Sequence, residues 1–377
     1  LRHQRGLGIE GLLGDAVFQH AWRRLERRHR PETTQMSERT MQETKAQQDI
    51  VLEVEDLTVE FRLEAETVHA VNHISFKLQK GHTLGFVGET GAGKTTTALS
   101  ILRLVPHPGN VDCKALKVCG QDVLSMTSHQ LEKYRGNDVA MIFQDPMTSL
   151  NPVFTVGQQI ADSIMLHQKV SAAEALKKAE EMLELVGIPA NRQAEYPHQF
   201  SGGMKQRVII AIALACNPEV MIADEPTTAL DVTIQAQVLN LMKQLRDERH
   251  MSMLMITHDL GIIADVCDEV AVMYAGRIVE TGTLEEVFNH TKHPYTEGLF
   301  NSLPNILNRN TKLKPIPGLM PDPSKLPAGC SFAPRCRYAG PECSQEQPHE
   351  HHFSDSHLFA CSAYSRAGFA LDRPEKN

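Results

Sequence analysis

One short segment constrains the fold of this 377-residue chain more than any other. Residues 88–95 read Gly-Glu-Thr-Gly-Ala-Gly-Lys-Thr and fit the pattern G-x-x-x-x-G-K-[ST]. The segment follows an apolar run at 83–87, which predicts a buried strand, and it precedes a stretch of helical character. Glycines let backbone N–H groups converge on phosphate oxygens, and a helix start adds partial positive charge. The order of strand, glycine loop and helix therefore predicts a phosphate-binding loop.

This loop implies a nucleotide with Mg²⁺. The side chain of Lys94 is expected to reach the β- and γ-phosphates, and the hydroxyl of Thr95 is expected to bind Mg²⁺. The residues predicted to contact ATP are Gly88, Glu89, Thr90, Gly91, Ala92, Gly93, Lys94, Thr95 and Thr96.

A second apolar run, at 220–223, ends in two adjacent carboxylates. Alone, such a pair is more often a solvated strand end, but after a phosphate-binding loop it predicts a division of labour. Asp224 would bind Mg²⁺, and Glu225 would act as the general base on the attacking water.

A second helix start also suits an anion. Ser201 can cap a helix, and Gly202 and Gly203 leave its first backbone N–H groups bare. The presence of two such helix starts in one chain makes sense if the second start contacts a nucleotide that is bound by the phosphate loop of another subunit. The sequence therefore predicts a dimer.

The fold class follows from the order of the elements. Residues 51–61 alternate with period two, as in a half-buried strand, whereas 139–143, 220–223, 253–256 and 270–273 are short apolar runs typical of buried parallel strands. Helical patterns at 172–186, 204–215 and 232–246 separate them, so we predict an α/β fold with a mainly parallel sheet.

The net charge of −8 argues against a nucleic-acid partner. No window of about 18 uncharged apolar residues occurs, so a membrane role needs a partner.

These motifs, in this order, resemble the nucleotide-binding subunit of an ATP-binding-cassette (ABC) transporter. The resemblance implies a P-loop cassette with a RecA-like core, an antiparallel β subdomain and a helical subdomain at about 146–216. It also assigns further residues. Phe61 resembles the aromatic that stacks on adenine, Gln144 the glutamine that contacts Mg²⁺ and the attacking water, Asp231 the loop that crosses the dimer interface, and His258 the histidine that contacts the γ-phosphate.

Residues 143–152, 293–296 and a cysteine-bearing tail resemble, more narrowly, the ATPases of the oligopeptide, dipeptide and nickel importers. The resemblance implies two permeases, a second ATPase subunit (a paralogue or a second copy), and an indirect partnership with an extracytoplasmic binding protein. It places the chain peripherally on the cytoplasmic face of the membrane. We expect a cassette at 50–303 and a C-terminal module at 304–377.

Four cysteines cluster in that module, namely Cys330, Cys336, Cys343 and Cys361. Their spacings are looser than those of typical zinc sites, and prolines brace the loops between them. Because some of the resembled ATPases carry a [4Fe–4S] cluster here, we expect such a cluster, with zinc or metal-free thiols as alternatives.

Two questions stay open at this level. Residues 1–49 form an Arg-rich extension, which we expect to be disordered or to precede a start at Met36 or Met41; an amphipathic helix on a membrane surface is the alternative. The rival functions are a cassette ATPase without a transport role and an ATPase that senses metal or redox state.

Overall fold

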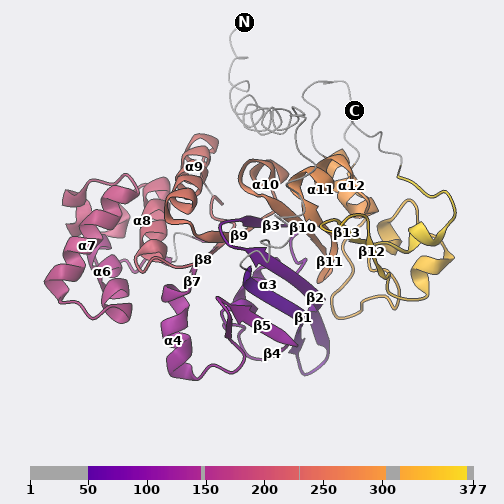
Figure 1. Cartoon of the computed structure of the whole chain (residues 1–377), viewed down its shortest axis with the longest axis horizontal. Helices are drawn as coiled ribbons and strands as arrows, with labels where there is room; N and C mark the ends of the chain where they lie inside the picture. Colours follow the sequence, from indigo (N-terminus) through magenta and orange to yellow (C-terminus); the bar gives the residue numbers. More distant parts are fainter. Residues whose placement is uncertain (1–49, 146–148, 229, 303–314, 372–377) are drawn as a thin grey trace, which may run out of the picture. The chain divides into compact units, whose positions relative to one another are not determined.

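The computed structural model describes residues 50–145, 149–228, 230–302 and 315–371 (Figure 1). They form two compact units, each assembled from separated stretches of the chain. The first unit holds described residues 50–53, 77–83 and 116–256, and the second holds 54–76, 84–115 and those from 257 onward. The expected extension at 1–49, the start of the helical segment at 146–148 and the start of the C-terminal module at 304–314 lie outside the described residues.

The first unit contains three parallel strands. They are β7 (Val139–Ile142), β8 (Val220–Asp224) and β9 (Ser252–Thr257). β8 lies between the other two, with Ala223 opposite Ile142 on one side and Met255 on the other. Nearly every residue of these strands is buried, which explains why the sequence shows continuous apolar runs rather than alternation.

Helices make up most of the rest of this unit. Each of the later ones begins at a polar residue whose side chain accepts a backbone N–H from the first turn, and these caps fix where the helices start. Figure 1 shows α6, α7 and α8 grouped together. The helices are α4 (Ser128–Asn137), α6 (Val156–His167), α7 (Ala172–Leu185), α8 (Gly202–Leu214) and α9 (Val232–Arg249).

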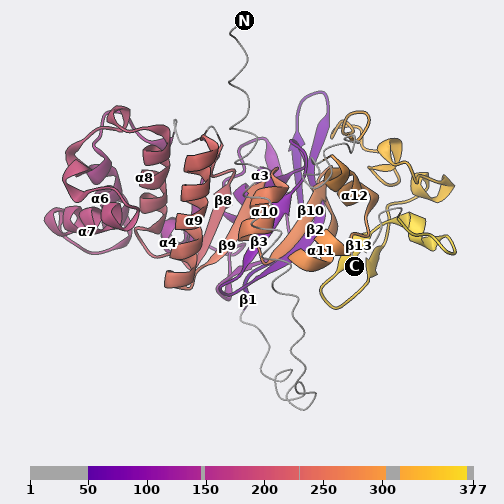
Figure 2. The ribbon, with the colours of Figure 1, turned by 90° about the horizontal axis from the view of Figure 1, so that it is seen from above.

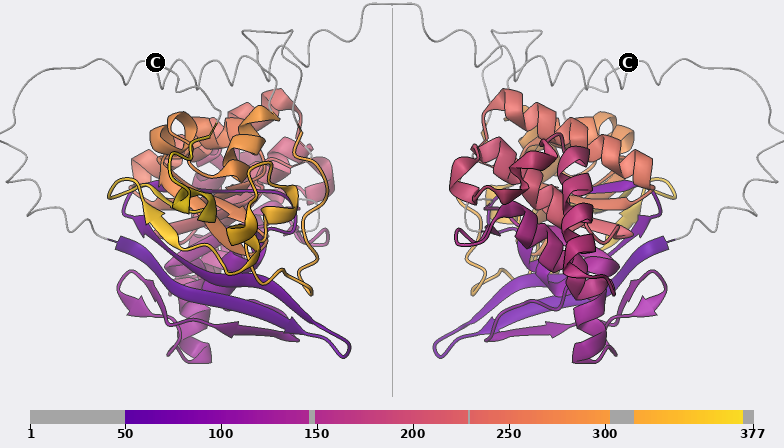
Figure 3. Two further views of the ribbon diagram at one scale, coloured as in Figure 1. Left: turned by 90° about the vertical axis from the view of Figure 1, so that its right-hand side faces the viewer. Right: turned by 90° about the vertical axis from the view of Figure 1, so that its left-hand side faces the viewer.

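Long antiparallel strands contribute mainly to the second unit. β1 (Ile50–Arg62) and β2 (Thr67–Gln79) are neighbours, visible as the indigo strands of Figure 3. β4 (Gly109–Asp112) pairs with the end of β1, which places Phe61 opposite Gly109. The hairpin of β5 (Ala115–Val118) and β6 (Gln121–Asp122) follows in the chain.

The second unit also holds a mixed set of strands. β3 (Thr83–Val87) runs parallel to β10 (Glu269–Tyr274), and β10 turns directly into antiparallel β11 (Arg277–Thr283). The two turn residues, Ala275 and Gly276, both have positive φ, as a type I′ turn requires. The sequence did not predict the antiparallel strand β11, because alanine is not a typical residue for a turn with positive φ.

The C-terminal residues extend this set of strands. β13 (Leu358–Ala360) pairs with β11, and β12 (Glu350–His352) pairs with β13. In Figure 2 the yellow C-terminal segment lies beside β13 and α12 (Pro294–Asn301). The other helices of the unit are α3 (Lys94–Ile101), α10 (Leu260–Val266) and α11 (Leu284–Asn289), and the short 3₁₀ turns are η3 (Ala333–Arg335), η4 (Pro341–Ser344) and η5 (Ser362–Ser365).

Candidate nucleotide-binding site

The phosphate-binding loop of the second unit has the predicted context. β3 ends at Val87, and α3 begins at Lys94, so the loop occupies the six residues between them. Gly93 precedes the helix with φ of 99°, and a Cβ there would lie 2.5 Å from the carbonyl oxygen of Ala70. Only glycine therefore fits at this position, and it leaves the first N–H groups of α3 without a capping side chain.

Lys94 lies inside the curve of this loop. Its ammonium donates to the carbonyl oxygens of Gly88, at 2.7 Å, and Glu89, at 3.0 Å. The residue is buried, whereas the following Thr95 is exposed. A buried ammonium held by backbone carbonyls has the charge and placement to bind phosphate oxygens at the start of α3.

Glu89 of the loop contacts two residues from distant parts of the sequence. Its backbone N–H donates to the hydroxyl of Tyr295 at 2.9 Å, and its carboxylate accepts from the guanidinium of Arg335 at 2.8 Å. More than 200 residues of sequence separate Glu89 from either partner. Sequence reasoning missed both partners because such distant contacts have no local signal.

Two predicted catalytic residues meet in the first unit. The Gln144 amide nitrogen donates to a carboxylate oxygen of Glu225 at 2.9 Å, and the Thr228 hydroxyl contacts the same oxygen at 3.0 Å. Glu225 has a positive φ of 45°, which a non-glycine residue adopts only at a cost of about 1–3 kcal/mol. Such strain is common at functional sites, where the fold holds a side chain in one position.

Asp224 is the last residue of the buried strand β8, is itself buried, and directly precedes Glu225 in the sequence. Its carboxylate and the Thr95 hydroxyl are the oxygen ligands that Mg²⁺ prefers. They lie in different units, as do the loop 88–96 and the pair of Gln144 and Glu225.

The second predicted helix start is also formed. Ser201 caps α8, and its hydroxyl accepts from the backbone N–H of Met204. A Cβ on Gly203 would lie 2.3 Å from the Ile234 side chain, whereas one on Gly202 would meet nothing closer than 3.6 Å. Gly203 thus lets α8 pack against α9, a role that sequence reasoning missed, and Gly202 leaves the helix start open.

The structure describes the remaining predicted residues without testing their roles. Asp231 caps α9, with a carboxylate oxygen 3.0 Å from the backbone nitrogen of Ile234. His258 is exposed just after β9, and Phe61 is partly buried at the end of β1. Their roles at a nucleotide stay predictions.

The four cysteines are near neighbours but not a formed metal site. The backbone N–H of Cys330 donates to the carbonyl of Cys343 at 2.8 Å. Burial, reinforced by the charges of the other thiols, raises the pKa of Cys336 to about 11 and that of Cys361 to about 12. Within the described ranges, no group of three or more His, Cys, Asp or Glu side chains is placed to hold a metal ion. Metal binding would require these thiols to lose protons and to move closer together.

Comparison with known proteins identifies the class. Residues 71–228 match the family described as ABC transporter, and residues 279–343 match the family described as oligopeptide/dipeptide transporter, C-terminal region. The fold is similar to that of the dimeric ATP-binding cassette MJ0796 in a post-hydrolysis state bound to ADP and Pi. That chain is 24% identical at a TM-score of 0.54, and the match covers 62% of this chain and 98% of that one. It is also similar to cbiO1 from Clostridium perfringens, part of the ABC transporter complex cbiONQ, with 27% identity, a TM-score of 0.53, and coverage of 64% and 91%.

Two curated relatives narrow this class. A protein of Brucella abortus named as a peptide import ATP-binding protein is 47% identical over 300 residues, 79% of this chain and 90% of that protein. A peptide ABC transporter ATP-binding protein of Sinorhizobium fredii is 48% identical over 322 residues, 83% and 95% of the two chains. The chain therefore belongs to the ATP-binding subunits of ABC transporters, in the group that carries the oligopeptide/dipeptide transporter C-terminal region. The predicted fold class and the predicted ATPase are confirmed at the level of the family. Among the residues that the structure describes, no helix has the length and apolar character needed to cross a bilayer.

Proposed function

We propose that this chain binds and hydrolyses ATP to drive the uptake of dipeptides, oligopeptides or a nickel complex through partner permeases. The contact between Gln144 and Glu225 carries the proposal of hydrolysis, because a strained backbone holds a carboxylate beside an amide that can orient water. The match of residues 279–343 to the oligopeptide/dipeptide transporter region supports transport rather than a cassette ATPase without a transport role.

We assign the chemical steps to this chain's own side chains. Lys94 and the loop at 88–96 bind the phosphates, and Phe61 stacks on the adenine. Glu225 takes a proton from the attacking water, which Gln144 orients, and His258 contacts the γ-phosphate. Thr95, Asp224 and Gln144 would hold Mg²⁺, which when bound offsets the negative charge that develops on the phosphate oxygens.

Two chains act together in this proposal. Ser201, Gly202 and Gly203 contact the nucleotide of a second ATPase subunit, a paralogue or a second copy, and Asp231 lies in the loop that crosses between them. ATP clamps the dimer shut, and hydrolysis reopens it. We divide the chain into an extension at 1–49, a cassette at 50–303 and a C-terminal module at 304–377.

The permeases would dock on the helical segment at about 146–216, at the cytoplasmic face of the membrane. Exposed apolar side chains support this surface, since Val153 is 70% exposed and Leu166 is 75% exposed. Other exposed apolar or aromatic side chains in or next to this segment are Phe143, Phe154, Met165, Leu176 and Tyr196. An extracytoplasmic binding protein would deliver the cargo to the permeases.

Uptake measurements test the proposed function. We expect cells that lack this chain to lose ATP-dependent uptake of a labelled dipeptide or oligopeptide, and the wild-type chain to restore it. Uptake of a free amino acid in the same cells serves as the control. Normal peptide and nickel uptake in the deletion strain, together with ATP hydrolysis by the purified chain, would favour the rival without a transport role.

We propose that the four cysteines hold a [4Fe–4S] cluster, with zinc as the alternative. Support comes from the backbone hydrogen bond between Cys330 and Cys343, and from neighbouring thiols that add to burial in raising the pKa of Cys330, Cys336 and Cys361. Anaerobically purified protein is expected to show the visible absorption of an iron–sulfur cluster, and Cys330→Ser is expected to remove it. Cys216→Ser, which changes a half-buried cysteine of the first unit, is the matched control. Colourless protein with stoichiometric zinc would contradict the cluster.

A further inference from the structure

An arginine from the C-terminal segment reaches the phosphate-binding loop. Arg335 lies at the end of η3, and its guanidinium donates to the carboxylate of Glu89 at 2.8 Å and to the carbonyl of Pro317 at 2.9 Å. The Arg335 side chain is only 7% exposed, and that of Glu89 is 31% exposed. Arg335 is thus shielded from solvent while Glu89 is partly exposed, which distinguishes this pair from fully exposed ion pairs that contribute little to stability.

The backbone of the same loop residue is held from a second side. Tyr295 of α12 accepts the Glu89 N–H, and its ring packs against Tyr274, with centroids 4.6 Å apart, and Phe332, at 5.4 Å. Phe332 precedes Arg335 by three residues. One aromatic cluster therefore supports both partners of Glu89.

The C-terminal segment also follows the loop for some distance. The Met320 methyl group lies 3.0 Å from the position of a Cβ on Gly91, and the carbonyl of Pro323 accepts from the N–H of His69. Two contacts with the loop, at Gly91 and Glu89, and one with β2, at His69, show that residues 320–335 and the loop belong to one packed region of the second unit.

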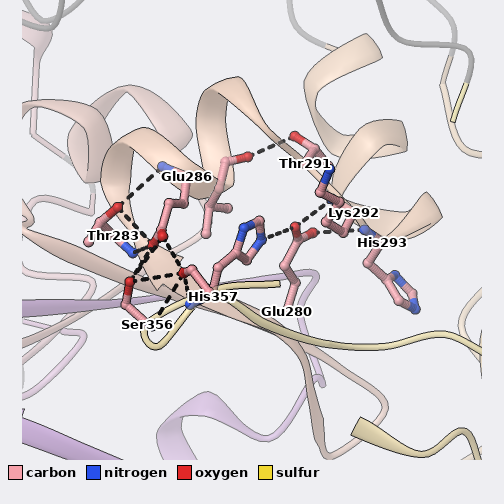
Figure 4. A network of polar contacts seen from close by, with 10 residues as sticks. Glu280, Thr283, Glu286, Thr291, Lys292, His293, Ser356 and His357 are labelled. Carbon is pink, nitrogen blue, oxygen red and sulfur yellow. Dashed lines mark hydrogen bonds and ion pairs between the residues drawn. The ribbon is translucent and has the colours of Figure 1, made fainter. Parts of the chain in front are cut away.

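A buried polar network anchors this region independently of the loop (Figure 4). The fully buried carboxylate of Glu280 accepts from the backbone N–H groups of Lys292, at 2.6 Å, and His293, at 3.0 Å, and pairs with the His357 ring at 2.9 Å. Burial lowers the pKa of His293 to about 3, so its neutral ring can accept the backbone N–H of Tyr295 at 3.1 Å. The network therefore joins His357 of the C-terminal segment to β11 and to the start of α12.

We propose that Arg335 is a positioning residue for the phosphate-binding loop, and that through Glu89 it sets the affinity for MgATP. The reason is electrostatic. Glu89 places a negative charge in a loop that binds a polyanion, and like charges at short range repel strongly where solvent is limited. Arg335 offsets that charge and holds it in one place. The inference rests on the proposed function, since it presumes that the loop binds ATP.

The test separates affinity from turnover. In full-length Arg335→Gln protein, we expect KM and the calorimetric Kd for MgATP to rise about tenfold, within the range typical of coupling between sites. We expect kcat to stay near that of the wild type, because Gln144 and Glu225 are untouched. Arg335→Lys keeps a positive charge but cannot hold both contacts, and an intermediate Kd is expected.

A double variant distinguishes positioning from general damage. Arg335→Gln combined with Glu89→Gln removes the unpaired acid, and we expect it to recover most of the lost affinity. The matched control is Arg337→Gln, which removes the same charge from the same segment but breaks a pair with Glu297 of α12. Its Kd for MgATP should match the wild type, with thermal unfolding recorded for every variant.

The outcomes are separable. Wild-type affinity for MgATP in Arg335→Gln would overturn the role proposed for Arg335 and leave the proposed function standing. A double variant that binds MgATP as weakly as the single variant would do the same. If the wild-type chain itself failed to bind MgATP, the proposed function would fall, and the inference with it.

Discussion

Replacing Glu225 with glutamine is expected to stop ATP hydrolysis and leave ATP binding intact. Glutamine has nearly the same shape, and its carbonyl oxygen can still accept from Gln144 and Thr228, so the local structure should persist. An amide cannot take a proton from water. Loss of a positioned general base typically lowers the rate by about 100- to 10,000-fold. Phosphate release and MgATP titration on the same preparation measure the two quantities.

The other end of the same strand supplies a control for this substitution. Glu219 immediately precedes β8, is about half exposed and pairs with Lys80 on the surface. Glu219→Gln removes the same charge far from the predicted chemistry, and hydrolysis should be unchanged. Hydrolysis at the wild-type rate in Glu225→Gln would remove Glu225 from the role of base.

The second large effect is expected for Lys94→Ala, which should lose nucleotide binding itself. The ammonium is the only positive side-chain charge among the described residues 88–101, and it lies at the start of α3. A charge-assisted hydrogen bond contributes about 1.5–3 kcal/mol, and two such contacts to phosphate imply an affinity loss of at least about 100-fold. Fluorescent ATP analogues would report this loss directly.

A surface lysine provides the comparison. Lys114 is exposed and pairs with Glu55, and such pairs contribute little to stability. Lys114→Ala should bind nucleotide like the wild type. Circular dichroism melting is needed for Lys94→Ala, because the variant leaves the carbonyls of Gly88 and Glu89 without this donor. A folded Lys94→Ala protein with wild-type affinity would contradict the assigned role.

Local patterns explain why so much of the site was predictable. The run from Thr83 to Thr95 contains a strand, a loop and a helix start in consecutive residues, and the same holds for the strand that ends at Asp224 and Glu225. Elements of this kind are formed by consecutive residues, so their apolar runs and glycines can be recognised directly in the sequence.

What the sequence did not reveal depends on distant or atypical contacts. The hairpin between β10 and β11 turns at Ala275, a residue that seldom adopts a positive φ. The contact between Gly203 and Ile234 joins two helices, and Arg335 reaches Glu89 across 246 positions. None of these leaves a periodic signal, because the geometry arises only when the elements pack.

The pairing of β13 with β11 has a consequence for how this chain behaves when it is cut. β11 is seven residues long, and alone it would present unpaired backbone groups to any other extended chain. β13 pairs with that edge at Glu280 and Thr281, and the outermost strand becomes β12, three residues long with Glu350 and two histidines. Short, polar outer strands resist strand-to-strand aggregation. β12 and β13 thus also limit strand-to-strand association, and proteolysis before residue 350 is expected to expose part of the edge of β11 to aggregation.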